Sequence, residues 1–374
     1  MNPLDRSGTP PGVSRAFLAC ALLAVLWPLP ARAQDVSVEG SVGAAWTDNV
    51  FRMRTPEWDA WVLPSLKAGV DFATFWTLQY EGSAEIYTNH TDLTSHDHAL
   101  RLLANPAFGT DDRDEFLVGL QVETLRNLDA YADLNFLGGQ IDAAVSLEPA
   151  TWFAWQAGAN VRYRRFYDDP QSDTLDVLAS TEARFTLQSR TTISPRIGYG
   201  FRYNPGLKGQ GEGRPDRDDH QLDAGLHFSQ GLWKDAGLQA DYSYRHLFTT
   251  SQALARKLTQ TQFTFLTADF LAGGHRAFLK WKQVLPRGWS LLAGLEFRAL
   301  RYPGWPVTDA AGNVIGGDRE DRRLTPSATL GYSHRFGALG LDARVSYSYL
   351  RQWSNSADYD TQAHQVGLAI GLEY

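Results

Sequence analysis

Apolar and polar residues alternate along most of the chain beyond residue 34. The pattern is clearest at the C-terminus, where small or polar residues separate five apolar ones: Val366, Leu368, Ile370, Leu372 and Tyr374. The same period of two recurs in long segments, among them 36–46, 58–72, 153–163 and 339–349. Such alternation is typical of β-strands with one apolar face. No convincing helical period of 3.6 residues is present, so the sequence predicts an all-β fold.

The connections between these segments alternate in length. The short ones lie at 73–75, 110–114, 148–151, 189–191, 231–235 and 336–338. The long, polar ones lie at 47–57, 89–97, 127–135, 165–174, 204–219, 249–258, 303–320 and 354–360. Short turns at one end and long loops at the other are the layout of an outer-membrane β-barrel, with short periplasmic turns and long extracellular loops.

Eight long loops imply eight hairpins, hence about 16 antiparallel transmembrane strands. The region 259–302 does not fit this count, because it contains short turns at 272–275 and 285–288 with no long loop between them. Bacterial single-chain barrels have an even number of strands. Either 260–271 is an inward-folded loop, or one more strand is present and the total is 18. We predict 16.

Composition and aromatic placement agree with this layout. Mean hydropathy is −0.32, yet aromatic residues reach 12%. No apolar run of 18 residues follows the N-terminal segment, which excludes helical membrane spans. Aromatic residues lie near short-turn ends (Trp152, Trp233, Trp289, Phe336, Tyr374) and near long-loop ends (Trp46, Trp58, Tyr163, Tyr203, Phe248, Tyr302, Trp353). Two aromatic girdles are expected at the two membrane interfaces. A soluble sandwich or propeller is the alternative, but no blade-length repeat is present.

The N-terminus has the pattern of a cleaved secretory signal peptide. Arg6 and Arg15 precede the apolar run "AFLACALLAVLWPLP", and "ARA" precedes Gln34. We expect a signal peptide at 1–33 and a single barrel domain at 34–374. Cleavage removes Cys20, the one cysteine, so the mature barrel is held without disulfides. It also changes the net charge from −7 to about −9, which argues against nucleic acid as a partner.

A barrel of this size has room for an aqueous lumen, so the polar face of its strands indicates what passes. Arginines gather on three adjacent predicted strands: Arg162, Arg164, Arg184, Arg196 and Arg202. Other strands present Glu296, Arg298, Asp342 and Arg344, together with Glu81, Glu85, Glu123, Asp241, Lys280 and Lys282. A basic wall facing an acidic one orients polar solutes and favours anions. Alternatively, these charges pair across strands and only fill the lumen.

Other candidate chemistry is weaker. His90, Asp92, His96, Asp97 and His98 share one predicted outer loop, but their loose spacing fits a solvated loop better than a metal site. His246 and Ser251 are the best base and nucleophile, without a G-x-S-x-G motif to support them. We expect no enzyme, metal or cofactor. Five outer arginines have the chemistry to bind lipopolysaccharide phosphates: Arg214, Arg217, Arg319, Arg322 and Arg323.

The alternation that ends in Tyr374 resembles the C-terminal signal of bacterial outer-membrane barrels. In that family the last strand closes the barrel beside the first, and the barrel assembly machinery reads its alternating residues and terminal aromatic. The resemblance implies that Val366, Leu368, Ile370, Leu372 and Tyr374 form this assembly signal. The family's commonest last residue is phenylalanine, and tyrosine is an accepted variant.

A second resemblance lies at the end of the first predicted strand, in "AAWTDNVFR" (44–52). It resembles the opening of outer-membrane β-barrels associated with exopolysaccharide secretion systems, with Trp46, Asp48, Asn49, Val50 and Arg52 matching. The resemblance implies export of a polymer through the outer membrane, with a separate periplasmic polysaccharide export protein as partner. An Asp-Asn pair also suits a turn where a strand ends, because both residues tolerate tight backbone geometry.

The leading interpretation is therefore a pore in the outer membrane of a Gram-negative bacterium that exports an exopolysaccharide. Two alternatives stay open: a general diffusion porin for small polar or anionic solutes, and a plugged barrel with a structural or surface-interaction role. Expected partners are outer-membrane lipid, lipopolysaccharide and the barrel assembly machinery.

Overall fold

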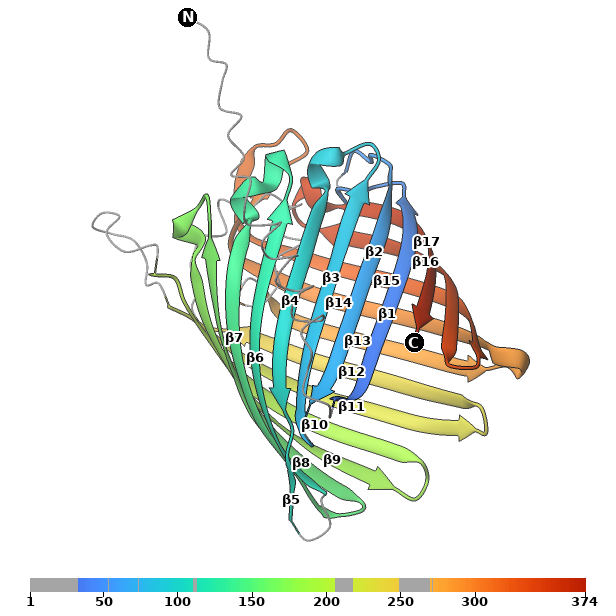
Figure 1. Ribbon diagram of the computed structural model, residues 1–374. Coiled ribbons are helices and arrows are strands. Elements are labelled where there is room, and N and C mark those ends of the chain that lie inside the picture. The colour runs from blue at the N-terminus through green and yellow to red at the C-terminus, as the bar shows by residue number, and fades with distance from the viewer. Residues whose placement is uncertain are drawn as a thin grey trace, which may run out of the picture.

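Long antiparallel strands make up nearly all of the computed structural model, which describes residues 33–52, 54–72, 74–109, 113–205, 218–248, 270 and 272–374 (Figure 1). The strands are β1 (Ala33–Thr47), β2 (Asp59–Phe72), β3 (Trp76–Tyr87), β4 (Ser95–Ala104), β5 (Ala107–Phe108), β6 (Asp114–Asn127), β7 (Phe136–Ala150), β8 (Phe153–Phe166), β9 (Thr174–Leu187), β10 (Thr191–Tyr203), β11 (Asp218–Trp233), β12 (Ala236–Leu247), β13 (Gly273–Val284), β14 (Trp289–Thr308), β15 (Val314–Phe336), β16 (Leu339–Ser354) and β17 (Thr361–Glu373).

The sheet closes on itself. Each strand pairs with its neighbours in sequence, and β1 pairs with both β2 and β17. The two-residue β5 only extends the pairing along β6, so the wall contains 16 strands. The predicted antiparallel barrel and its count of 16 are confirmed. Closure leaves no strand edge unpaired, which is what a β-structure surrounded by lipid requires.

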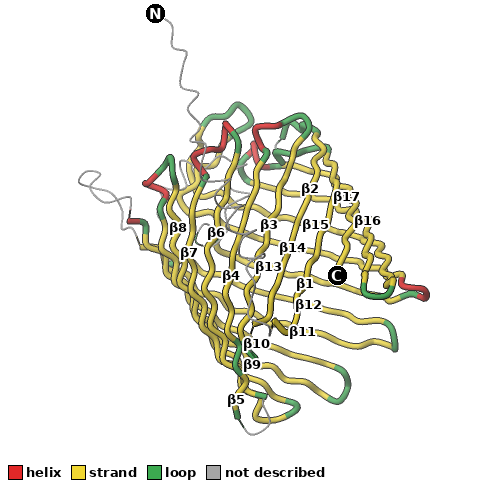
Figure 2. The backbone as a smooth tube through the Cα atoms, viewed as in Figure 1, coloured by secondary structure: helices red, strands yellow, loops and turns green. Residues whose placement is uncertain are grey.

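The two ends of the barrel differ as predicted. Short turns join the strands at one end, and longer segments at the other carry η1 (Thr91–Leu93), η2 (Asp129–Leu134), η3 (Pro170–Ser172) and η6 (Ala357–Tyr359) (Figure 2). Another short 3₁₀ turn, η5 (Pro286–Gly288), joins β13 to β14 at the short-turn end. Across the described ranges, none of the helices is long and apolar enough to span a bilayer.

Three predicted connections are corrected by the structure. The loop expected at 303–320 is mostly strand, because β14 and β15 continue outward as a hairpin that turns at 309–313. The loop expected at 89–97 ends earlier, since β4 begins at Ser95. The short turn expected at 272–275 is the start of β13. The inward-folded loop considered at 260–271 lies outside the described residues, apart from Phe270.

Burial is inverted relative to a soluble protein. The largest fully buried side chains are all polar: Gln221, Gln352, Asn204, Asp59, Asp176 and Ser356. The outer surface instead exposes aliphatic residues, including Leu226, Leu330 and Ile370. Lipid surrounds the wall, so apolar side chains point outward and polar ones gather in the lumen.

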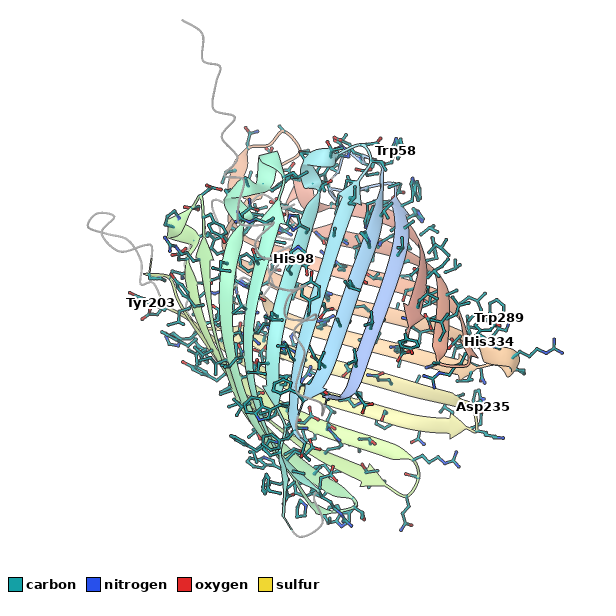
Figure 3. All side chains as sticks on the ribbon, in the orientation of Figure 1. Trp58, His98, Tyr203, Asp235, Trp289 and His334 are labelled. Atoms are coloured by element: carbon teal, nitrogen blue, oxygen red, sulfur yellow. The ribbon has the colours of Figure 1, made fainter. Side chains whose placement is uncertain are left out.

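The aromatic girdles follow the same rule with one exception. Figure 3 shows Trp58 and Tyr203 toward the long-loop end, and Trp289 and His334 toward the short-turn end. Tyr302 was predicted to belong to the outer girdle, but only 3% of it is exposed. It faces the lumen, because it occupies an inward position of β14 and opposes Arg319 of β15.

Candidate functional site: the lumen

The predicted lumen residues all lie on the inward face of the wall. In β8, for example, Arg162 and Arg164 alternate with the lipid-exposed Val161 and Tyr163. The same alternation places the other predicted residues on the inside: Arg184, Arg196, Arg202, Glu296, Arg298, Asp342 and Arg344. That these side chains govern transport stays a prediction.

The arginine-rich wall contains its own carboxylates. Asp176 of β9 stands directly opposite Arg162 of β8 and Arg202 of β10. Arg202 Nε donates to Asp176 Oδ1 at 2.6 Å, and Arg162 Nη2 lies 3.6 Å from Oδ2. Arg164 of β8 reaches across Gly138 of β7, and its Nε lies 3.1 Å from Oε1 of Glu123 on β6. The predicted separation into a basic wall and an acidic wall is therefore wrong here, because carboxylates lie among the arginines, on the adjacent strand or one strand further.

A second network lies on β15 and β16, near the outer end. The Arg319 guanidinium donates to the Asp321 carboxylate, and each residue is only 3% exposed. Gln352 donates to the same carboxylate, at 3.1 Å from Oδ2, and to Tyr359 O at 2.9 Å. Three aromatic rings surround the guanidinium. Arg319 Cζ lies 3.4 Å from the ring centroid of Tyr359, 4.4 Å from that of Tyr302 and 5.6 Å from that of Trp305. The network is fully partnered, as a buried ion pair must be.

This network was missed in the sequence, where Arg319, Arg322 and Arg323 were expected in a solvated outer loop, with phosphate binding as the alternative. The period-two pattern of 317–323 is masked by consecutive charged residues, so the strand was not recognised. In the structure Arg319 and Arg323 face the lumen, and Arg322 faces outward. Arg214 and Arg217 lie outside the described residues.

Apolar residues from opposite walls meet over the outer mouth. Leu134 of η2, Ala272 and the β14 residues Tyr302 and Trp305 form one buried cluster. Six strands, β8 to β13, separate β7 from β14 around the wall, so this contact crosses the barrel rather than following it. Phe270 joins from the same side as Ala272 and lies 4.6 Å from the Arg202 guanidinium. The mouth is therefore narrowed by residues from several outer connections.

The short-turn half of the lumen is more open. A cavity of about 1080 Å³ reaches the turn at Leu285 and Gly288. Its polar lining is dominated by small side chains: Ser41, Ser65, Ser83, Ser290, Thr329, Ser333 and Ser346. The charged residues among them are Lys280, Lys282, Asp342 and Arg344, and Arg344 Nε lies 2.6 Å from Asp342 Oδ1. Short hydroxyl side chains leave room for water, so this half can hold a hydrated solute.

The candidate metal ligands of the outer loop do not converge in the structure, although His96 and His98 share the outward face with ring centroids 5.2 Å apart. Asp97 faces the lumen, where Ser83 donates to it, whereas His98 faces outward and its Nδ1 lies 2.8 Å from the Tyr80 hydroxyl. No group of three or more potential metal ligands occurs in the described part of the chain. His246 also faces outward, against Phe248, and Ser251 lies outside the described residues.

His90 instead fastens the outer loop between β3 and β4. Its Nδ1 lies 3.0 Å from Asp59 Oδ2, and its Nε2 lies 2.8 Å from Glu57 Oε2. Asp59 also accepts hydrogen bonds from the backbone N–H groups of Thr88, Asn89 and His90. Desolvation opposes protonation of His90, but the bonds to Glu57 and Asp59 outweigh it and raise the pKa of the imidazole. The loop is thus tied to Asp59 of β2 by the His90 side chain.

The Asp-Asn pair closes the seam between the first and last strands. The backbone N–H of His364 in β17 donates to Asp48 Oδ1 at 2.6 Å. Asn49, which is 2% exposed, donates from Nδ2 to Thr361 Oγ1 at 2.8 Å and to Gln362 O at 3.0 Å. The pair therefore does more than form a turn, because it ties the first outer loop to the start of the last strand.

At the other end of the same seam, the chain terminus is part of the sheet. Tyr374 N donates to Val38 O at 2.9 Å, and Val38 N donates to Tyr374 O at 3.1 Å. All five residues of the predicted assembly signal point into the lipid: Val366, Leu368, Ile370, Leu372 and Tyr374. Their recognition by the assembly machinery stays a prediction.

Solved structures similar to this one are outer-membrane proteins. CdiB from Acinetobacter baumannii superposes with a TM-score of 0.53 at 11% identity, over 91% of this chain and 60% of that chain. A bacterial polysaccharide outer membrane secretin gives 0.49 at 8% identity, over 90% and 97% of the two chains. OccK1 (OpdK) from Pseudomonas aeruginosa gives 0.44 at 11%, over 91% and 99%. No protein-family model and no curated protein matches the chain.

These likenesses show the fold alone. The chain is an outer-membrane-type β-barrel, and it spans 60% of the length of CdiB. Together with the lipid-facing apolar surface, the fold indicates the outer membrane as its location.

Proposed function

We propose that the barrel is a transport pore of the outer membrane and that its cargo is an exopolysaccharide. The observation that carries the proposal is the polar lumen: a cavity of about 1080 Å³, lined by hydroxyl and charged side chains, enters the barrel from the short-turn end. Short turns face the periplasm in barrels of this kind, so the wide entrance is on the side from which an exported polymer arrives.

The narrowed mouth agrees with export better than with passive diffusion. A permanently open diffusion pore would let other solutes leak, whereas a mouth covered by Trp305 and Tyr302 stays narrow until a chain passes. The resemblance of residues 44–52 to barrels of exopolysaccharide secretion systems supports the same cargo. A periplasmic polysaccharide export protein is the partner that this function requires.

Conductance in a planar bilayer tests the proposal. The refolded full chain is expected to conduct ions weakly at rest, and neutral oligosaccharides added to the periplasmic side are expected to interrupt the current. In cells, loss of the protein is expected to leave polymer in the periplasm. Free passage of small solutes with no effect on polymer secretion would instead identify a diffusion porin.

The mouth cluster also favours one rival, a plugged barrel with a structural or surface role. A correctly folded protein that stays silent in the bilayer, with and without sugars, and whose loss leaves secretion unchanged, would establish it. Lipopolysaccharide is a further proposed partner, since Arg322 and Arg165 point outward near the long-loop end and their guanidinium groups match its phosphates.

A further inference from the structure

Three arginines stand side by side on the lumen wall near the outer end. Arg298 of β14 is directly opposite Arg276 of β13 on one side and Arg323 of β15 on the other. Like charges placed directly opposite each other destabilise a sheet. A row of three therefore needs a compensating negative charge or a functional reason.

The compensation inside the protein is incomplete. Glu296 serves two members of the row, because its Oε1 accepts from Arg276 Nε at 2.7 Å and from Arg298 Nε at 2.8 Å. Arg323 instead donates to the neutral amide oxygen of Gln352, at 3.0 Å from Nε and 2.6 Å from Nη2. The row thus carries more positive charge than the carboxylate between its members can balance.

A fourth arginine adds to this charge from the first outer loop. Arg52 directly follows the segment that Asp48 and Asn49 tie to β17, and its φ of 52° is in the left-handed region, which is strained for a residue with a side chain. Burial lowers the pKa of Arg52 to about 10, and the nearby charges of Arg323 and Arg298 act in the same direction. The guanidinium still carries its charge at neutral pH.

These groups surround a pocket of about 460 Å³, within the usual range for small-molecule sites. Arg52, Arg298 and Arg323 line it together with Trp61 and Tyr87, whose rings stack at 5.3 Å. The Tyr87 hydroxyl donates to Glu85 Oε2 at 3.0 Å. The remaining polar lining includes two carboxylates, Glu85 and Glu296, so the three arginines exceed the carboxylates by one, and also Thr47, Asn49, Thr325, Ser348 and Gln365. Guanidinium forks bind carboxylates in bidentate fashion, and aromatic rings offer an apolar face to a sugar ring.

We propose that this pocket is a binding subsite for an acidic sugar whose carboxylate lies between Arg52 and Arg323 and whose ring lies against Trp61 and Tyr87. The proposal rests on the proposed function and names its substrate class: a polymer that contains uronic acid residues. The bound carboxylate supplies the negative charge that the arginine row lacks. A neutral sugar makes the aromatic contact but leaves the row uncompensated, so it binds more weakly.

Calorimetry on the folded full chain in detergent tests this subsite. The probes are oligogalacturonate, a neutral galactose oligomer of the same length, and inorganic sulfate. Oligogalacturonate is expected to bind about tenfold or more tightly than the neutral oligomer, and Arg52→Gln or Arg323→Gln is expected to remove most of that advantage, as loss of one charge-assisted hydrogen bond predicts. Arg52→Lys keeps the positive charge but loses the bidentate guanidinium, so its affinity for oligogalacturonate is expected to lie between those of the unaltered protein and Arg52→Gln.

The matched control is Arg335→Gln, which removes the same charge from the same strand at the exposed short-turn end and is expected to leave affinity unchanged. Equal binding of acidic and neutral oligomers, equal loss in Arg335→Gln, or full competition by sulfate at equal concentration would overturn the proposal. Sugar-free conductance separates it from the proposed function. A pore that conducts without preferring the acidic oligomer keeps the pore and refutes the subsite, whereas tight specific binding by a silent barrel keeps the subsite and refutes the pore.

Discussion

The outer half of the lumen is filled by packed, paired side chains, whereas the periplasmic half is open. The outer half contains long side chains in contact with one another, such as Arg319 with Asp321 and Arg202 with Asp176, beneath an apolar cluster that crosses the mouth. The periplasmic half has short hydroxyl side chains around an open cavity. A buried charge must be paired, whereas a charge beside water need not be. Under the proposed export function, the polymer enters at the open short-turn end and is selected at the packed outer end.

The largest expected effect is on conductance. Replacing both Trp305 and Tyr302 with alanine removes the rings that cross the mouth, and single-channel conductance is expected to rise about twofold or more, because a narrow apolar constriction limits water and ions. Trp152→Ala is the control, since this ring is exposed at the other end and does not line the cavity, so its loss is expected to leave the conductance unchanged. An unaltered current in the double variant would mean that the narrowest point lies elsewhere.

The next largest expected effect is on the free energy of unfolding, which should differ between variants in the outer half and variants in the short-turn half of the lumen. Arg319→Gln leaves the Asp321 carboxylate buried without its cation and is expected to lower the free energy of unfolding by about 3 kcal/mol. Arg344→Gln breaks the exposed pair with Asp342 and is expected to cost less than about 1 kcal/mol. Denaturant unfolding of the barrel in lipid vesicles measures both. Equal costs would contradict the contrast between a packed outer half and a hydrated inner half.

Ion selectivity provides a further comparison between the charges of the open half and those of the packed outer half. Lys280 and Lys282 line the open cavity and form no ion pair within the described residues. Replacing both with glutamine is expected to shift the reversal potential toward cations while the unfolding free energy changes by less than about 0.5 kcal/mol. Replacing Arg162 and Arg164 is expected to shift selectivity in the same direction and also to destabilise the barrel, because Asp176 and Glu123 lose partners. A stable Arg162/Arg164 variant would argue against paired packing.

The smallest effect is expected in the loop held by His90. The raised pKa means that its protonated form is stabilised by Glu57 and Asp59, so this contribution is complete below about pH 6.5 and is lost as pH rises through the higher folded-state pKa. The protection factors of the amides of 88–94, which are exchange rates corrected for the intrinsic rate at each pH, are expected to fall over that pH range. His90→Gln is expected to show low protection at every pH, and a fall in protection that persists in this variant would exclude His90 as its source.

Much of the architecture was predictable from the chain because it depends on local pattern. Side chains alternate with a period of two in any strand, so lipid on one face and water on the other leave a readable pattern, and the loop lengths indicate which end is which. The alternating pattern did not reveal a strand where consecutive charged residues hid the difference between its two faces. Arg319 and Asp321 share the lumen face of β15 with Glu320 on the other face between them, yet the run "GDREDRR" has the composition of a solvated loop.

The sequence by itself determined the closed barrel and the polar character of its lumen and favoured 16 strands over 18, since each follows from the repeating chemistry of single strands. Only the tertiary structure decided which charges meet. Register between strands places Asp176 between two arginines and aligns Arg276, Arg298 and Arg323 in one row. Barrel closure brings Asp48 and Asn49 to β17, more than 300 residues away, and so positions Arg52 in the pocket. Contacts of this kind depend on strand pairing across the whole ring, and no local pattern in the chain records them.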